Sequence, residues 1–225
     1  MTLLLSRVAE AAGTAELIRG GRVDVPRTQQ LWLIRHGETE WSAAGRHTGL
    51  TDLPLTPRGE RQVEGLRRRL RGREFALVLS SPLRRAHDTC AFAGFGDRAV
   101  VDADLCEWDY GAYEGRTTAQ IRAEVPGWDL WSAGVPGGET VAQVGLRADR
   151  VIARVQRESG DVALFAHAHL LRVFTARWLG MDPALGRWFA LDAASVSVVG
   201  HEHEHHVMWL WNDVSHLAPE IELTP

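Results

Sequence analysis

A histidine follows directly on an apolar segment near the start of the chain, in the stretch LWLIRHGETEW (residues 31–41). Residues 31–34 have the pattern of a short buried strand, and Arg35, His36 and Gly37 come next. Open α/β sheets bind their ligands beyond the carboxyl ends of their strands. The pattern therefore gives His36 the place of a catalytic or ligand-binding residue. Taken alone, the triplet is better explained as a loop histidine beside an arginine, so other segments have to decide.

Basic residues follow two further apolar segments in the same way: Arg84 and Arg85 after residues 75–80, and His167 and His169 after residues 161–166. In a parallel sheet these segment ends share one edge. Arginines, histidines and helix N-termini gathered there form an anion pocket that favours phosphate. Each residue alone also has a plainer interpretation, Arg84 as a solvated helix residue and His169 as a helix cap.

Strand and helix patterns alternate along the chain. We expect strands at 31–35, 74–81, 98–105, 161–166, 194–200 and 206–212, and helices from Thr56-Pro57 to 70, from Pro82 to 93, at 138–160 and at 168–180. Thr56 is the predicted N-cap of its helix, with Pro57 at the first helical position. This alternation predicts an α/β fold, a three-layer sandwich with a mostly parallel central sheet flanked by helices.

The length of 225 residues, 45% of them hydrophobic, fits one globular domain, which we place at residues 31–225. Residues 1–30 are interpreted as an N-terminal extension. Apolar positions within 3–18 have helical spacing and end before Gly20-Gly21, which predicts a helix docked on the domain or on a partner subunit. Docking on a partner subunit corresponds to a homodimer. A disordered leader is the alternative.

Composition excludes several classes of protein. All 25 basic residues are arginine, which excludes Schiff-base enzymes and Walker-type phosphate loops because both need a lysine. A net charge of −4 gives no attraction to nucleic acid or an acidic membrane, and we expect neither as a partner. Cys90 and Cys106 are interpreted as reduced thiols of a cytoplasmic protein without a signal peptide.

Six segments in order resemble the histidine phosphatase superfamily, with its phosphoglycerate-mutase-like fold. They are RHGETEW, TGLTDLPLTPRGE, SSPLRRAHDT, LCEWDYGAYEG, PGGET and FAHAHLLR, and they span roughly residues 31–180. The loop TEWSAAGRHTGLTDLPLTP is most similar to sedoheptulose bisphosphatases and related bacterial acid phosphatases. The triplet alone is weak evidence, whereas six ordered segments are specific.

The resemblance implies that His36 is the nucleophile, and that Arg35, Arg85 and His167 hold the phosphate. An imidazole nitrogen attacks phosphorus in line and forms a phosphohistidine. Catalysis of such a transfer is mostly positioning and charge stabilisation. The resemblance places Arg85, rather than Arg84, at the family position, and a bound phosphate favours a protonated His167.

Glu107 in CEWDYG matches the proton donor of the family. It would protonate the leaving oxygen and then, as carboxylate, activate the water that clears the phosphohistidine. Asp109, two residues further on, is the rival for this role, and a surface acidic turn is the plainer interpretation of both. The scheme requires no metal and no other cofactor.

A substrate-binding set is expected around the reacting phosphate: Ser42, Thr48, Gly49, Tyr110, Ala168 and His169. Backbone N–H groups of Thr48 and Gly49 are expected to meet a sugar or a second phosphate. Two residues depart from the family pattern. Ser42 replaces an asparagine, and Ala168 replaces a glycine whose loss could crowd the phosphate or demand another backbone angle.

The predicted activity is that of a phosphatase for small phosphorylated sugars, with a sugar bisphosphate or a C7 sugar phosphate favoured. Only 60 positions separate Glu107 from His167, too few for the insertion that seals the pocket of the family's mutases. A phosphoglycerate-type phosphomutase and a phosphate-binding pseudoenzyme with a regulatory role are the alternatives.

The stretch HEHEHH (201–206) fits a solvent-facing hairpin better than a metal site. Trp128 and Trp131 fit either a pocket mouth or the core.

Overall fold

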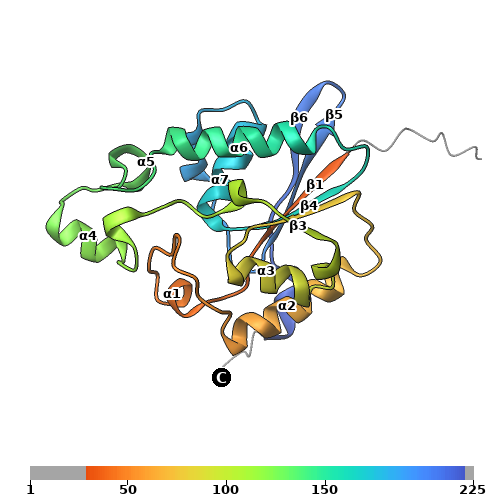
Figure 1. Ribbon diagram of the computed structural model, residues 1–225, viewed down its shortest axis with the longest axis horizontal. Coiled ribbons are helices and arrows are strands. Elements are labelled where there is room, and N and C mark those ends of the chain that lie inside the picture. Colours follow the sequence, from red (N-terminus) through yellow and green to blue (C-terminus); the bar gives the residue numbers. More distant parts are fainter. Residues whose placement is uncertain (1–28, 221–225) are drawn as a thin grey trace, which may run out of the picture.

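A six-stranded mixed sheet forms the centre of the computed structural model, which describes residues 29–220 (Figure 1). Its order is β3-β2-β4-β1-β5-β6. The strands are β1 (Gln30–Arg35), β2 (Leu77–Ser80), β3 (Ala99–Val101), β4 (Val162–Ala166), β5 (Val196–Glu202) and β6 (His205–Asp213). The first four run parallel, whereas β5 pairs antiparallel with β1 and β6 antiparallel with β5.

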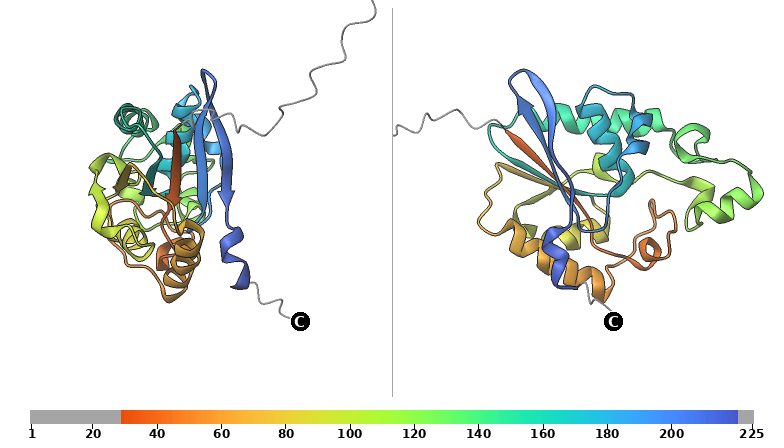
Figure 2. Two further views of the ribbon diagram at one scale, coloured as in Figure 1. Left: turned by 90° about the vertical axis from the view of Figure 1, so that its right-hand side faces the viewer. Right: turned by 180° about the vertical axis from the view of Figure 1, so that it is seen from behind.

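Helices cover both faces of this sheet, and Figure 2 shows the resulting layers from two further sides. The helices are α1 (Glu40–Ala43), α2 (Pro57–Leu70), α3 (Arg84–Phe92), α4 (Thr118–Glu124), α5 (Leu130–Ala133), α6 (Val141–Val155) and α7 (Ala168–Trp178). One apolar cluster joins the sheet to α2 and α3, and the other joins it to α6 and α7. The expected three-layer α/β sandwich is confirmed.

The central strand β1 shows why the sheet is covered on both sides. Leu31 and Leu33 belong to the cluster under α6 and α7, whereas Trp32 and Ile34 belong to the cluster under α2 and α3. Side chains alternate between the two faces of a strand, so a strand buried on both reads as one continuous apolar run. In the part of the chain described, no helix is long and apolar enough to cross a membrane.

Local sequence sets the helix boundaries. The side chain of Thr56 caps α2 by accepting from the N–H of Gly59, as expected, and Pro57 opens the helix. Helix α6 begins only after Thr140, which forms a capping box with Gln143, so the predicted start at 138 is too early. Helix α3 likewise begins at Arg84 rather than at Pro82.

The parallel pairing brings three strand ends to one edge. Arg35 at the end of β1 lies opposite Ala166 at the end of β4, and Ser80 of β2 lies opposite Phe165. The residues that follow these ends therefore become neighbours. The helix expected within residues 1–30 lies outside the described residues.

Candidate active site

His36 lies at this edge and is held by its backbone on two sides. Its N–H donates to the carbonyl of Ala166 at 3.0 Å, and its own carbonyl accepts from the N–H of Ala194 at 2.9 Å. The next residue must be small, because a Cβ on Gly37 would lie 2.8 Å from the carbonyl oxygen of Gly59. This backbone frame fixes the point from which the imidazole projects.

The hydrogen bonding of His36 defines its tautomer. Its side chain is buried, and Nδ1 lies 2.7 Å from the carbonyl oxygen of Gly37. Because a carbonyl oxygen only accepts, Nδ1 carries the proton and Nε2 keeps its lone pair. Burial, followed by the positive charges of Arg85 and Arg35, holds the pKa of His36 well below its usual value. The ring is therefore neutral, with a nucleophilic Nε2.

Arg85 and His167 form a hydrogen-bonded pair beside His36. The Nε–H of Arg85 donates to Nδ1 of His167 at 3.2 Å, and Nε2 of His167 lies 2.8 Å from the hydroxyl oxygen of Ser81. The ring centroids of His36 and His167 are 5.2 Å apart. Since Nδ1 accepts, Nε2 carries the single proton and donates it to Ser81.

His167 is therefore neutral in this arrangement, and the protonated form expected in the presence of a bound phosphate stays a prediction. Burial and the charge of Arg85 hold its pKa well below the usual value. The guanidinium of Arg85 supplies the positive charge next to this neutral ring. Ser81, which fixes the tautomer of His167, had no role assigned from the sequence, where nothing links it to a residue 86 positions away.

Arg35 adds a second buried cation. One of its terminal nitrogens donates to the carbonyl of Leu191, while its Nε has no hydrogen-bond partner among the residues described. Burial lowers the pKa of Arg35, and the negative charges of Glu107 and Asp192 oppose that shift. The cluster thus contains an unsatisfied guanidinium donor next to His36, which suits an anionic ligand.

Glu107 is buried and caps the start of α7. Its carboxylate accepts from the N–H groups of Trp108 at 2.9 Å, His169 at 3.1 Å and Leu170 at 2.9 Å. The last two are unpaired donors of the first helical turn. These three bonds fix the carboxylate at the start of α7, 4.0 Å from Nδ1 of His169. They also use the α7 N–H groups that were expected to face an anion.

Asp109 is engaged elsewhere. Its Oδ1 accepts from the N–H of Gly111 at 2.9 Å, and its backbone N–H donates to Glu139. The side chain therefore closes a local turn, whereas the charge of Glu107 acts directly on both Arg35 and Arg85. Of the two carboxylates, the geometry favours Glu107 for the reacting position.

Tyr110 and His169 share a hydrogen bond of 2.7 Å between the phenol oxygen and Nδ1. Burial and the nearby charge of Glu107 raise the pKa of Tyr110 well above its usual value, so its hydroxyl keeps the proton and donates it. Burial and then the charge of Arg172 hold the pKa of His169 well below the usual value. Both expected binding residues thus lie beside Glu107 as neutral polar groups.

Tryptophan rings pack against His169 and against His47, a histidine of the loop that precedes Thr48. The ring of His47 lies 5.5 Å from that of Trp128, and the ring of His169 lies 5.5 Å from that of Trp131. Trp128 and Trp131 are both buried in the core cluster under α6 and α7. They are core residues whose rings pack against the rings of His47 and His169.

The loop at Thr48 and Gly49 faces the site differently from the expectation. The N–H of Gly49 donates to both carboxylate oxygens of Glu114, at 2.9 and 3.0 Å, so it is not directed to a substrate. The carbonyls of Thr48 and Gly49 instead accept from Arg85. The sequence could not reveal this, because Glu114 is 65 positions away.

Ser42 is also committed to a local contact. Its hydroxyl accepts from the N–H of Thr39 at 2.8 Å and donates to the carbonyl of Thr39 at 3.0 Å. It thereby completes the capping box of α1. The hydroxyl that was expected to contact phosphate is thus engaged by the backbone of Thr39 in this arrangement.

Ala168 is the first residue of α7 and has an ordinary helical backbone. Among the non-glycine residues described, a left-handed backbone occurs only at Ala194, His203 and Asn212. The methyl group of Ala168 therefore causes no backbone strain, contrary to the concern raised by its departure from glycine.

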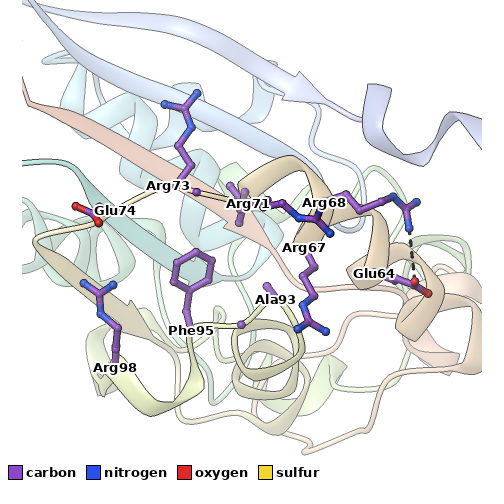
Figure 3. A pocket seen from close by; sticks show the side chains of 12 residues that line it. Glu64, Arg67, Arg68, Arg71, Arg73, Glu74, Ala93, Phe95 and Arg98 are labelled. Atoms are coloured by element: carbon purple, nitrogen blue, oxygen red, sulfur yellow. Dashed lines mark ion pairs between the residues drawn. The ribbon is translucent and has the colours of Figure 1, made fainter.

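A separate groove lies away from this edge. It measures about 800 Å³ and is formed by the end of α2 and the segments that precede β2 and follow α3. Figure 3 shows its arginine side chains diverging, with Arg68 directed to Glu64. Arg73 lies over the ring of Trp32 and Arg98 donates to the carbonyl of Phe75. Arg68, Arg73 and Arg98 thus serve contacts within the protein, and the arginine side chains do not converge on one point.

The histidine-rich hairpin between β5 and β6 packs on α7. His206 stacks on Trp178 at 4.1 Å between ring centroids, and His201 meets the same ring edge-on at 5.1 Å. Between residues 29 and 220, no group of three or more His, Cys, Asp or Glu side chains is placed to hold a metal ion.

The mixed α/β sheet with two histidines, two arginines and a carboxylate at one edge is the arrangement of a phosphate-transferring enzyme. A model of the histidine phosphatase superfamily (branch 1) matches residues 31–214. An acid phosphatase of Mycobacterium tuberculosis is 44% identical over 182 residues, covering 79% of this chain and 89% of that protein. Sedoheptulose 1,7-bisphosphatase of Saccharomyces cerevisiae is 40% identical over 187 residues, covering 68% and 69%.

Solved structures agree with this comparison. The product of a Mycobacterium tuberculosis open reading frame superimposes with a TM-score of 0.79 at 42% identity, covering 83% of this chain and 98% of that one. The chain belongs to the histidine phosphatase superfamily. Its resemblance to the acid phosphatase and sedoheptulose bisphosphatase branch is confirmed, and both of these relatives are named phosphatases.

Proposed function

We propose that this protein is a metal-independent phosphatase that hydrolyses small phosphorylated sugars through a phosphohistidine at His36. The observation that carries the proposal is the orientation of the His36 ring. Nδ1 is bound to the carbonyl of Gly37, so the unprotonated Nε2 is the reactive nitrogen, in the field of two buried arginines. A neutral imidazole beside fixed positive charge is what in-line attack on a phosphate ester requires.

In the first step, a bond forms between Nε2 of His36 and phosphorus, and the bond from phosphorus to the sugar oxygen breaks. Glu107 receives the proton of a monoanionic phosphate ester as the ester binds, and gives that proton to the leaving oxygen. Arg35 and Arg85 stabilise the charge that develops on the transferring phosphoryl group. In the second step, the Glu107 carboxylate takes a proton from water, whose oxygen attacks phosphorus and releases His36.

The preference for a sugar bisphosphate or a C7 sugar phosphate rests on two supports. The yeast relative at 40% identity is named a sedoheptulose 1,7-bisphosphatase. Beside the reacting residues, Tyr110 and His169 offer neutral hydrogen-bonding groups, and the positive charge of Arg172 acts on His169. Polar groups of this kind suit sugar hydroxyls, and a third guanidinium suits a second phosphate.

The test is phosphate release from a panel of sugar monophosphates and bisphosphates in the presence of a metal chelator. We expect release by the wild type, highest with bisphosphates or C7 sugar phosphates, and none by His36→Ala. His205→Ala, which removes an exposed hairpin histidine, is the matched control and should equal the wild type. Isomerisation of phosphoglycerate without net release would favour a mutase, and binding without any turnover would favour a pseudoenzyme.

A further inference from the structure

Glu114 holds a short backbone segment of the site. Its Oε1 accepts from the N–H of Gly49 at 2.9 Å and of Thr51 at 3.0 Å, and its Oε2 accepts from the N–H of Gly49 at 3.0 Å. Hydrogen bonds of this kind to an ionised acceptor are stronger than neutral ones. The half-buried carboxylate thus fixes the segment 48–51 from outside the cluster of histidines.

The same segment binds Arg85 through its carbonyl groups. One terminal nitrogen of Arg85 donates to Thr51 at 3.0 Å, and the other donates to Thr48 at 3.1 Å and to Gly49 at 2.9 Å. With the bond from Nε to His167, four of the five guanidinium N–H groups have protein acceptors. The plane of the guanidinium is therefore set by the position of segment 48–51.

Space around Gly49 shows how closely this segment is seated. A Cβ at this position would lie 2.6 Å from Oε2 of Glu114 and 2.6 Å from the carbonyl oxygen of Trp108. Only glycine lets the backbone approach both groups. The negative charge of Glu114 also favours the charged form of Arg85, opposing the effect of burial on its pKa.

We propose that Glu114 is a positioning residue that orients Arg85 through segment 48–51, so that the guanidinium meets both His167 and the reacting phosphate. The part that concerns phosphate rests on the proposed function, whereas the orientation of Arg85 does not. Glu114 itself has no hydrogen bond to His36 or His167 among the residues described. Its hydrogen bonds reach the reacting phosphate through segment 48–51 and Arg85.

The first readout is the NMR signal of the Arg85 Nε–H, assigned with Arg85→Lys, in the wild type and in Glu114→Ala. A buried Nε–H bonded to His167 exchanges slowly with water, so we expect a sharp signal in the wild type and a lost or broadened signal in Glu114→Ala. Glu114→Gln keeps one oxygen that can accept from both Gly49 and Thr51, and should restore the signal. Glu124→Ala, which removes an exposed carboxylate paired with Arg116, is the control.

The second readout is the affinity for inorganic phosphate, measured by calorimetry, together with kcat and KM for the best substrate. We expect Glu114→Ala to weaken phosphate binding and kcat/KM by about 10–100-fold, the scale of a lost hydrogen bond to a charged group. Gly49→Ala should cause a similar loss, because it displaces the same segment. In an Arg85→Ala background, adding Glu114→Ala should change phosphate affinity by less than about 2-fold.

A normal Arg85 signal in folded Glu114→Ala would overturn the proposal. So would a loss of phosphate affinity on Glu114→Ala that is equally large in the wild type and in the Arg85→Ala background. If the wild type binds no phosphate, the proposed function fails, but the Arg85 signal still decides the positioning role. Should Glu114→Ala not fold, Gly49→Ala and Glu114→Gln decide instead. Gly49→Ala should weaken phosphate binding, and Glu114→Gln should keep the Arg85 signal.

Discussion

The carboxylate of Glu107 accepts a hydrogen bond of 2.9 Å from the backbone N–H of Leu170, in the first turn of α7. This bond ties the predicted acid–base residue to the helix that begins directly after His167. The position of the carboxylate is consequently coupled to that of His167, the residue before the first turn of α7. Any substitution that shifts α7 shifts both.

Glu107→Gln should lower kcat by about 10²–10³-fold, because an amide can neither donate the proton to the leaving oxygen nor activate water. Asp109→Asn should retain kcat within about 3-fold, since that side chain accepts from a turn N–H that an amide oxygen can also satisfy. Steady-state kinetics of both variants decide the assignment. Equal losses, or a larger loss for Asp109→Asn, would reverse it.

Ala168→Gly should leave kcat/KM within about 2-fold of the wild type, because Ala168 already has a helical backbone. Its free energy of unfolding should fall by no more than about 1 kcal/mol, the difference between the two residues in a helix. Kinetics and urea unfolding of the same preparation measure both. A large gain in activity would mean that the methyl group obstructs the phosphate.

Stability should decrease as the solution is made mildly acidic. Burial holds the pKa values of His36, His167 and His169 well below the usual value of about 6.5 that they regain on unfolding. Below pH 6.5 the unfolded chain therefore binds protons that the folded chain does not. The free energy of unfolding falls by up to about 1.4 kcal/mol per pH unit for each histidine, and this contribution is constant above that pH.

Urea unfolding at pH 7.5 and 5.5 measures this loss. His205→Ala should leave the difference between the two pH values unchanged, because His205 is exposed, whereas His169→Gln should reduce it. Equal stability of the wild type at both pH values would show that the buried histidines titrate normally.

His203→Gly should stabilise the hairpin between β5 and β6 by about 0.5–1 kcal/mol. His203 has a φ of 54°, in the left-handed region that glycine adopts without steric cost, and this gain exceeds the extra entropy of glycine in the unfolded chain. Glu204→Gly, at the neighbouring turn position outside that region, should be neutral or destabilising. Thermal unfolding of the two variants compares them, and the reverse order would contradict the strain at His203.

The sequence predicted those features that depend on local pattern. The apolar run before His36, the cap at Thr56 and the strand before His167 each have a recognisable signature, and together they bring the basic residues to one sheet edge. The predicted ends of helices and strands are less accurate than the predicted elements themselves. Helix α6 was placed too early because the pattern around Gly138 did not reveal that Thr140 is its cap.

Contacts between distant segments could not be predicted. The Gly49 N–H faces Glu114, and the Arg85 guanidinium is held by carbonyls of residues 34 to 37 positions away. Backbone groups look alike in every sequence, so no local pattern says which of them a side chain will meet. The tautomers of His36 and His167 depend on the same long-range geometry.

The central claim is that His36 carries the phosphoryl group, and rapid-quench labelling tests it most directly. The wild type is mixed with its best substrate, quenched in alkali, in which phosphohistidine survives, and analysed by peptide mass spectrometry. We predict one added phosphoryl group on His36 in the wild type and none in His36→Ala. Turnover without any phosphorylated His36, or with the label on another residue, would contradict the account.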